Sequence, residues 1–267
     1  MKKTLAFLTL FSLFFAAPAA FAQDSVVIGT VSGSDVAFLE KAAEIAAKDG
    51  LKVTIKEFSD YGQLNPALAA GDIDLNSFQH APYLKSFLED FPADLTPIGN
   101  TYVAPMGFYS KRIKNLDELK TGDVVVVQND PSNGGRALLL LQKAGKIKLN
   151  PAAGITPTPY DITENPLKLR LIEVDAAQTP TALDDAVAVA VNNNYATPAG
   201  LNPLRDSIYL EGEDSPYINI IVARTKDKDN PNYAKFVKAY QSQEVAEFIL
   251  EKDGGSTLPA FPYKKPE

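Results

Sequence analysis

Apolar residues recur along the chain at two alternating spacings, one typical of strands and one typical of helices. Short apolar or alternating runs predict strands over residues 26–29, 51–58 and 73–78. Longer runs with an apolar residue every three or four positions predict helices over residues 36–48, 66–70 and 82–88. Strands and helices that alternate in this order favour an α/β fold in which mainly parallel strands are covered by helices.

The same alternation returns further along the chain. Apolar runs predict strands over residues 124–127, 186–191 and 218–223, and helices over residues 132–144 and 232–251. Two extended stretches, around residues 101–109 and 215–224, could carry the chain from one lobe to another and back. The pattern alone leaves open whether the strands form one wide sheet or two lobes.

The N-terminus has the pattern of a secretory signal peptide. Lys2 and Lys3 precede an apolar run over residues 5–15, and residues 20–22 (AFA) fit the small-x-small cleavage pattern. The run is too short for a bilayer, which takes about 20 residues. We therefore predict a signal peptide over residues 1–22 and a mature chain that begins at Gln23.

Composition excludes several classes of protein. The chain has no cysteine, which rules out disulfides, a thiol nucleophile and thiolate metal ligands. Because a lipid anchor would call for a cysteine just after the signal, we expect a periplasmic protein that is not lipid-anchored. The net charge is −7 and becomes −9 without Lys2 and Lys3. An acidic chain with no basic face is a poor nucleic-acid binder.

Few residues support an enzyme. Asp184 and Asp185 are typical of a helix or turn surface, whereas Asp72 and Asp74 flank the start of a strand and could form an acid/base or metal site. His80 is the only histidine, and a zinc site needs more ligands. No GxSxG elbow, phosphate loop or dinucleotide turn is present. We expect no catalytic residue, metal or cofactor, and keep an enzyme as a remote alternative.

Seven segments, taken together, indicate a family. They are NSFQHAPYL at 76–84, PMGFYS at 105–110, NDPSNGGRAL at 129–138, DITENP at 161–166, NNNYA at 192–196, AGLNP at 199–203 and SPYIN at 215–219. In order and spacing they resemble the NlpA/MetQ family of methionine-binding proteins. The chain departs from many members in the missing lipidation cysteine and in the middle of the segment at 192–196.

The resemblance implies the type II periplasmic binding fold, with two α/β lobes joined by two crossover segments. We place lobe 1 at residues 24–103 plus 217–267 and lobe 2 at residues 104–216. The resemblance also implies a solute-binding protein, expected to be a monomer, that captures L-methionine and delivers it to the permease of an ABC importer. D-methionine, methionine sulfoxide, a methionine dipeptide or another small amino acid are the alternative ligands.

The polar groups of an amino acid need specific partners. A guanidinium offers a carboxylate two parallel N–H donors, and a helix N-terminus offers free N–H groups. The resemblance implies Arg136 on the ligand carboxylate, with Asn133 beside it, and Asn192 and Asn219 as holders of the ligand backbone. A surface arginine and a turn-capping Asn192 are the alternatives that the residues leave open.

The apolar side chain of methionine needs a different surface. Tyr61, Phe78 and Tyr83 match the aromatic slot of the family, where each thioether–ring contact contributes roughly 0.3–1.5 kcal/mol. Without the resemblance, aromatic residues at this spacing are more typical of a core. We expect His80 to line the slot and orient a neighbour, without acting as a base.

Overall fold

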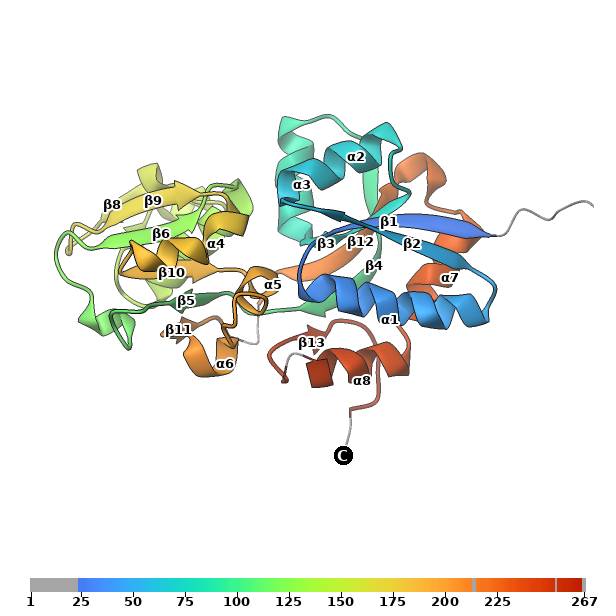
Figure 1. The fold of residues 1–267 in the computed structure, drawn as a ribbon. Coiled ribbons are helices and arrows are strands. Elements are labelled where there is room, and N and C mark those ends of the chain that lie inside the picture. The colour runs from blue at the N-terminus through green and yellow to red at the C-terminus, as the bar shows by residue number, and fades with distance from the viewer. Residues whose placement is uncertain (1–23, 213–214, 253, 266–267) are drawn as a thin grey trace, which may run out of the picture.

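The computed structural model describes residues 24–212, 215–252 and 254–265. Two α/β lobes lie side by side, each built around its own β-sheet (Figure 1). The alternative of one wide sheet is therefore wrong. The predicted signal peptide at residues 1–22 lies outside the described residues. In the described ranges, no helix has the length and apolar character needed to cross a bilayer.

The first lobe contains a six-stranded sheet in the order β13-β4-β12-β3-β1-β2. Its strands are β1 (Ser25–Val31), β2 (Lys52–Phe58), β3 (Leu75–His80), β4 (Leu95–Val103), β12 (Ile218–Arg224) and β13 (Leu258–Pro259). Strand β1 pairs in parallel with β2 and β3, whereas β12 is antiparallel to β3 and β4.

The second lobe contains a five-stranded sheet in the order β11-β5-β10-β6-β9. Its strands are β5 (Gly107–Tyr109), β6 (Val124–Gln128), β9 (Arg170–Val174), β10 (Ala188–Val191) and β11 (Tyr209–Leu210), with a separate pair, β7 (Lys148–Leu149) and β8 (Ile162–Glu164). Strand β6 is parallel to β9 and β10, and β5 is antiparallel to β10 and β11.

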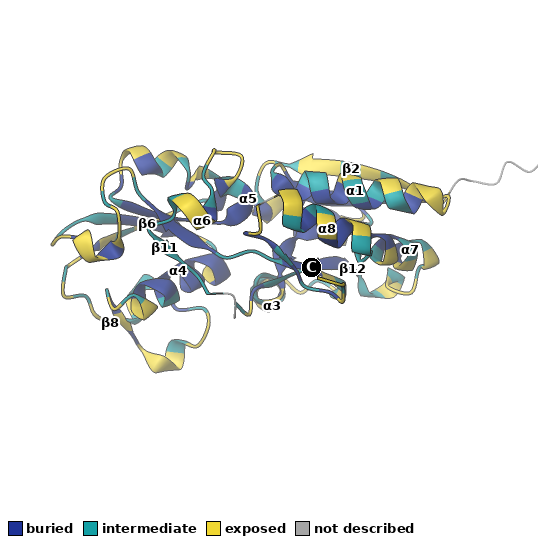
Figure 2. Cartoon of the chain, turned by 90° about the horizontal axis from the view of Figure 1, so that it is seen from below, coloured by how far each residue is buried: buried dark blue, intermediate teal, exposed yellow. Residues whose placement is uncertain are grey.

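Helices cover both faces of the first sheet. Helices α1 (Ser34–Lys48), α7 (Pro231–Tyr240) and α8 (Gln243–Lys252) pack on one face, and α2 (Leu64–Ala70) and α3 (Ala81–Asp90) on the other. In the second lobe α4 (Pro131–Lys143) packs on β6, and α5 (Asn193–Ala196) and α6 (Pro203–Asp206) follow β10. The central strands β3 and β10 are buried, whereas the edge strands β2 and β9 and the outward faces of the helices are partly exposed (Figure 2).

The connections between the lobes explain the mixed sheets. The chain crosses at residues 104–106, between β4 and β5, and returns between β11 and β12. The predicted parallel pairing is present between strands linked through helices, such as β1 and β3. Strands next to the crossovers add the antiparallel pairs, so both sheets are mixed.

The stretch over residues 232–251 is helical as predicted, and it contains two helices, α7 and α8. Helix α7 ends at Tyr240, and Gln241 leaves the helical conformation with φ −84° and ψ 25°. The Ser242 hydroxyl then accepts a hydrogen bond from the Val245 N–H at 3.3 Å, at the start of α8. A side-chain oxygen that caps an N–H in this way begins a new helix. The chain therefore turns here, and both α7 and α8 pack on the core of the first lobe.

Candidate functional site

A narrow cavity lies between the lobes, and every predicted site residue lines it. The first lobe contributes Tyr61, Phe78, His80, Tyr83 and Asn219, and the second contributes Asn133, Arg136 and Asn192. The further lining residues are Ser34, Gln79, Tyr102, Ala104, Asn193 and Asn194. The free space is about 30 Å³, room for only one or two water molecules. An amino acid can therefore enter only when the lobes move apart.

The first lobe supplies an aromatic slot, formed by Tyr61, Phe78 and Tyr83. Tyr61 begins a 3-10 helix (Tyr61–Gln63), Phe78 lies in β3, and Tyr83 lies in the first turn of α3. The ring centroids of Phe78 lie 5.7 Å from Tyr61 and 5.5 Å from Tyr83, and the two tyrosines are 5.9 Å apart. Rings at these distances and tilts stabilise one another. The slot is thus held by its own packing.

A buried amide network supports the slot from within the first lobe. Asn65 donates to the Gln79 Oε1 at 2.9 Å, Gln79 donates to the Asn65 Oδ1 at 2.7 Å, and Asn76 donates to the same Oδ1 at 2.9 Å. All three side chains are buried, and a fully paired buried network holds its members in fixed positions. Sequence reasoning missed this network. One amide side chain within the apolar strand at residues 73–78 and another directly after it were a signal of buried polar contacts.

His80 connects the slot to the second lobe. It caps α3, where its Nδ1 accepts the Tyr83 N–H at 3.1 Å, so the proton of the neutral ring is assigned to Nε2. That N–H then donates to the Asn133 Oδ1 at 3.1 Å. Burial, and then the positive charge of Arg136, lower the pKa of His80 to about 3. The neutral ring therefore aligns two neighbours, Tyr83 and Asn133.

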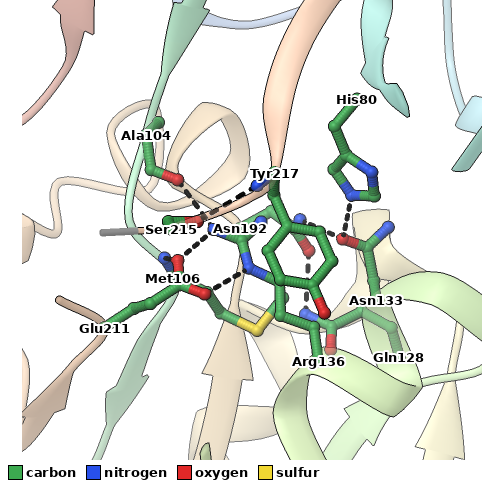
Figure 3. A network of polar contacts seen from close by, with 10 residues as sticks. All are labelled: His80, Ala104, Met106, Gln128, Asn133, Arg136, Asn192, Glu211, Ser215 and Tyr217. Carbon is green, nitrogen blue, oxygen red and sulfur yellow. Dashed lines mark hydrogen bonds and ion pairs between the residues drawn. The ribbon is translucent and has the colours of Figure 1, made fainter. Parts of the chain in front are cut away.

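The amides of the second lobe form a chain of hydrogen bonds (Figure 3). Gln128 donates to the Asn192 Oδ1 at 2.8 Å, and Asn192 donates to the Asn133 Oδ1 at 2.8 Å. Asn133 in turn donates from its side chain to both carboxylate oxygens of Asp130 at 3.0 Å. Gln128 was missed, because nothing in an apolar strand of four valines marks its last residue as a partner for Asn192.

Arg136 is held more tightly than the sequence predicts. Its Nε donates to the Glu211 Oε1 at 3.0 Å, and its Nη2 contacts the other carboxylate oxygen and donates to the Ala104 carbonyl at 2.9 Å. The ring of Tyr217 covers the guanidinium carbon at 4.3 Å (Figure 3). The side chains of Arg136 and Glu211 are only 4% and 9% exposed. Among the described residues, only Nη1 is left without a protein partner.

The alternative of a surface arginine is wrong, because Glu211 and Tyr217 enclose Arg136. Helix α4 begins at Pro131, where Asp130 caps it by accepting the Asn133 N–H at 2.8 Å, so Arg136 lies beyond the first turn. Glu211 was missed, since it lies 75 residues further along the chain with no motif around it.

Hydrogen bonds between described residues join the lobes across the cavity. The Tyr61 hydroxyl donates to the Asn194 Oδ1 at 2.7 Å, and Asn193 donates to the Thr257 Oγ1 at 2.8 Å. Another is the contact between His80 and Asn133. Asn193 and Asn194 were noted only as departures from the family motif, and here they contact the opposite lobe.

The acidic pairs weighed as enzyme candidates have structural partners. Asp74 accepts the Val27 N–H at 2.8 Å, and Asp184 forms an ion pair with Lys111 on the surface. Over the residues that the structure describes, no group of three or more histidine, aspartate and glutamate side chains could hold a metal ion. The chemistry of the cavity is thus that of aromatic rings, amides and one arginine.

Comparison with known proteins identifies the relatives of the chain. The model of the NlpA lipoprotein family matches residues 26–261. The D-methionine-binding lipoprotein MetQ of Salmonella typhimurium is 49% identical over 225 residues, which are 83% of each chain. A nutrient-binding protein from Burkholderia cenocepacia, solved bound to methionine, is 48% identical, with a TM-score of 0.87 over 88% of this chain and 100% of that one. The crystal structure of the methionine-binding protein MetQ also has a TM-score of 0.87 and is 44% identical, over 89% of this chain and 98% of that one.

These comparisons contradict the prediction that the protein is not lipid-anchored. The matching family is described as a lipoprotein family, and relatives that include MetQ of Salmonella typhimurium and of Escherichia coli are named lipoproteins. The prediction rested on the absence of cysteine from the sequence, whereas the family and these relatives carry the name lipoprotein. An extracytoplasmic location is supported by the same names.

Proposed function

Because the chain belongs to the NlpA lipoprotein family, we propose that it is a solute-binding protein that captures L-methionine between its lobes and delivers it to an ABC importer. The names of its relatives and the methionine-bound structure of a 48% identical protein support this ligand. D-methionine, methionine sulfoxide, a methionine dipeptide and another small amino acid are the alternatives. We propose further that the protein is a monomer and not an enzyme.

One observation carries the proposal: aromatic rings from one lobe face a guanidinium and amides from the other across a single cavity. A thioether packs well against rings such as Tyr61, Phe78 and Tyr83. The ligand carboxylate pairs with the Nη1 of Arg136, since the other guanidinium donors bind Glu211 and Ala104. Asn219 lies in β12 opposite His80, and no side-chain hydrogen bond engages it among the described residues. It is therefore placed to accept from the ligand ammonium, together with Asn192.

Ligand binding is coupled to lobe closure in this proposal. We assign residues 24–103 plus 217–267 to lobe 1 and residues 104–216 to lobe 2, because the strands of each sheet come from these ranges. A ligand that touches both faces stabilises the closed form by the difference between its affinities for the closed and open forms. The hydrogen bonds Tyr61–Asn194, His80–Asn133 and Asn193–Thr257 between the lobes stabilise the same closed form.

A thermal-shift panel on refolded, ligand-free mature protein tests the ligand class. The panel holds the twenty amino acids, D-methionine, methionine sulfoxide and short methionine peptides. Ligand at a thousand times its dissociation constant adds about 4 kcal/mol to the free energy of unfolding, which is roughly 8–16 °C for a chain of this size. A shift confined to methionine and its close relatives is expected, and a flat panel would remove methionine from first place.

Uptake of labelled methionine tests the delivery step. Cells that lack this protein are expected to lose high-affinity uptake, and the restored wild-type gene is expected to recover it. A matched strain carrying the Arg136→Ala variant controls for expression, because the variant is expected to be exported but not to restore uptake. Uptake that is unaffected by loss of the protein would contradict its role in import.

A further inference from the structure

A backbone contact joins the lobes beside the cavity, at Gly33. This residue lies in the loop between β1 and α1, and Figure 1 shows α5 of the second lobe next to the start of α1. A Cβ atom on Gly33 would lie 2.5 Å from the backbone carbonyl oxygen of Asn194 in α5. Ordinary van der Waals contacts are about 1 Å longer. A residue with a side chain therefore does not fit between the two backbones.

The backbone conformation of Gly33 is also one that glycine adopts and other residues rarely do. Its φ is 156° and its ψ is −157°, a region populated essentially by glycine. Gly50 and Gly71 have positive φ as well, but a Cβ atom on either would point into open space. Those two glycines follow the ends of helices α1 and α2, where such a φ is common. Gly33 differs because it combines a special conformation with a contact to the other lobe.

Both partners of this contact are held in place within their own lobes. In the first lobe, Ser32 donates its N–H to the Phe58 carbonyl at 3.2 Å, directly before Gly33. In the second lobe, the Ala196 N–H donates to the Asn192 carbonyl at 2.9 Å, and Ala196 is fully buried in the core. Because packed cores resist displacement, a side chain at Gly33 would be accommodated by separation of the lobes.

We propose that Gly33 is a positioning residue for ligand capture: it seats the α5 backbone on the first lobe and thereby sets how far the lobes close. This inference rests on the proposed function, since it assumes that closure captures the ligand. The same turn of α5 carries the amides that join the lobes, through Tyr61–Asn194 at 2.7 Å and Asn193–Thr257 at 2.8 Å. A displacement of about 1 Å would lengthen these contacts beyond hydrogen-bonding range. A side chain at position 33 would thus weaken capture from outside the cavity, which Gly33 does not line.

Gly33→Ala and Gly33→Val test the inference by placing a small and a larger side chain at the contact. Titration calorimetry is expected to show methionine binding about five- to a hundredfold weaker, the range for an overpacked contact, with the larger loss in Gly33→Val. X-ray scattering gives the radius of gyration without ligand and with methionine at a hundredfold excess over the dissociation constant of each protein. The wild type is expected to contract with methionine, and both variants are expected to contract less at the same occupancy.

Gly71→Ala is the matched control. Its φ of 89° imposes backbone strain in the same lobe, while its surroundings are open. This variant is expected to melt at a lower temperature than the wild type, as Gly33→Ala does, but to bind methionine and contract like the wild type. All ligand-free variants are expected to unfold cooperatively, because the contact between Gly33 and Asn194 belongs to the closed form.

Full contraction of Gly33→Val at equal occupancy would overturn the inference, whatever its affinity. A ligand-free Gly33→Ala that does not fold, while Gly71→Ala does, would also overturn it, because Gly33 would then serve the fold of the first lobe. An equal loss of affinity in Gly71→Ala would assign the effect to strain and contradict the inference. If the wild type binds methionine without contracting, the inference fails and the ligand assignment stands. A wild type that does not bind methionine would instead refute the proposed function.

Discussion

The two walls of the cavity are built on opposite principles. The wall from the first lobe is an aromatic slot whose rings pack on one another and on a paired amide network. The wall from the second lobe is polar, and its amides and guanidinium already have partners in Gln128, Asp130 and Glu211. Both walls are thus preorganised, the first by packing and the second by hydrogen bonds.

The difference teaches how each wall responds to change. Loss of a ring removes apolar surface that touches the ligand, and the binding free energy weakens roughly in proportion to the area removed. Loss of one partner from a buried charged pair leaves the other charge uncompensated, which costs several kcal/mol. Substitutions in the polar wall are therefore expected to have larger effects than substitutions in the aromatic wall.

The largest effect is expected for Arg136→Ala. The variant loses the proposed carboxylate partner and leaves Glu211 buried without its cation. Calorimetry is expected to show methionine binding about thirtyfold to several thousandfold weaker, because loss of a buried charge-assisted partner costs about 2–5 kcal/mol. Unchanged affinity would contradict the role of Arg136.

Arg224→Ala is the matched control for Arg136→Ala. Arg224 is also largely buried and paired with carboxylates, Asp227 and Asp74, but it lies in the first lobe and does not line the cavity. The Arg224→Ala variant is expected to have a lower melting temperature with little change in its affinity for methionine. An equal loss of affinity in both variants would assign the effect of Arg136→Ala to general destabilisation.

The next effect concerns pH and the contact between the two walls. Burial lowers the pKa of His80 from 6.5 to about 3, so the unfolded chain takes up a proton that the folded protein excludes. Its contribution to stability is present above pH 6.5 and is lost as the pH falls towards 3, by about 1.4 kcal/mol per pH unit. At pH 5 the loss is about 2 kcal/mol.

His80→Gln isolates this effect, because His80 is the only histidine in the chain. Denaturant unfolding of wild type and variant at pH 7.5, 6 and 5 is the measurement. The wild type is expected to lose stability faster than the variant below pH 6.5. Parallel pH profiles would show that His80 titrates normally in the folded protein.

A smaller effect is expected in the aromatic wall. Phe78→Leu keeps an apolar side chain but removes the ring that faces Tyr61 and Tyr83. Methionine affinity is expected to fall about tenfold, near the upper end of a single thioether–ring contact. Phe87→Leu, in the same helix as Tyr83 but outside the cavity, is the control and is expected to leave affinity unchanged.

The smallest effect is expected for a hydrogen bond between the lobes that does not touch the ligand. Thr257→Val keeps the shape of the side chain and removes the acceptor of the Asn193 amide. One such bond contributes about 0.5–1.5 kcal/mol, so affinity is expected to fall by at most about tenfold through a less stable closed form. Thr101→Val, a buried threonine in β4 of the same lobe, is the control. Equal affinities in the wild type, Thr257→Val and Thr101→Val would show that this hydrogen bond does not affect closure.

Much of the aromatic wall could be predicted from the sequence. Strand β3 and the start of α3 follow from periodicity, and a motif places Phe78, His80 and Tyr83 where strand gives way to helix. Residues close in sequence stay close in space, so a short segment carries most of this wall. The supporting contact of Gln79 with Asn65 could not be predicted, because only the tertiary fold sets which amide faces which.

The polar wall was predicted less completely, for a physical reason. Arg136 and Asn192 were identified one by one, but their partners are distant in sequence or unmarked by any pattern. Glu211 comes from the second crossover, and Tyr217 covers the guanidinium from the same segment. These pairings join α4 to the second crossover, and no local periodicity records them.

The central claim is that both walls close on one methionine. Titration calorimetry of refolded, ligand-free protein with L-methionine tests it most directly, at pH 7.5. We predict one ligand per chain with a dissociation constant of micromolar or below, about −8 kcal/mol or stronger, and a negative heat-capacity change from burial of apolar surface. No detectable binding at millimolar methionine, by protein that refolds cooperatively, would contradict the account.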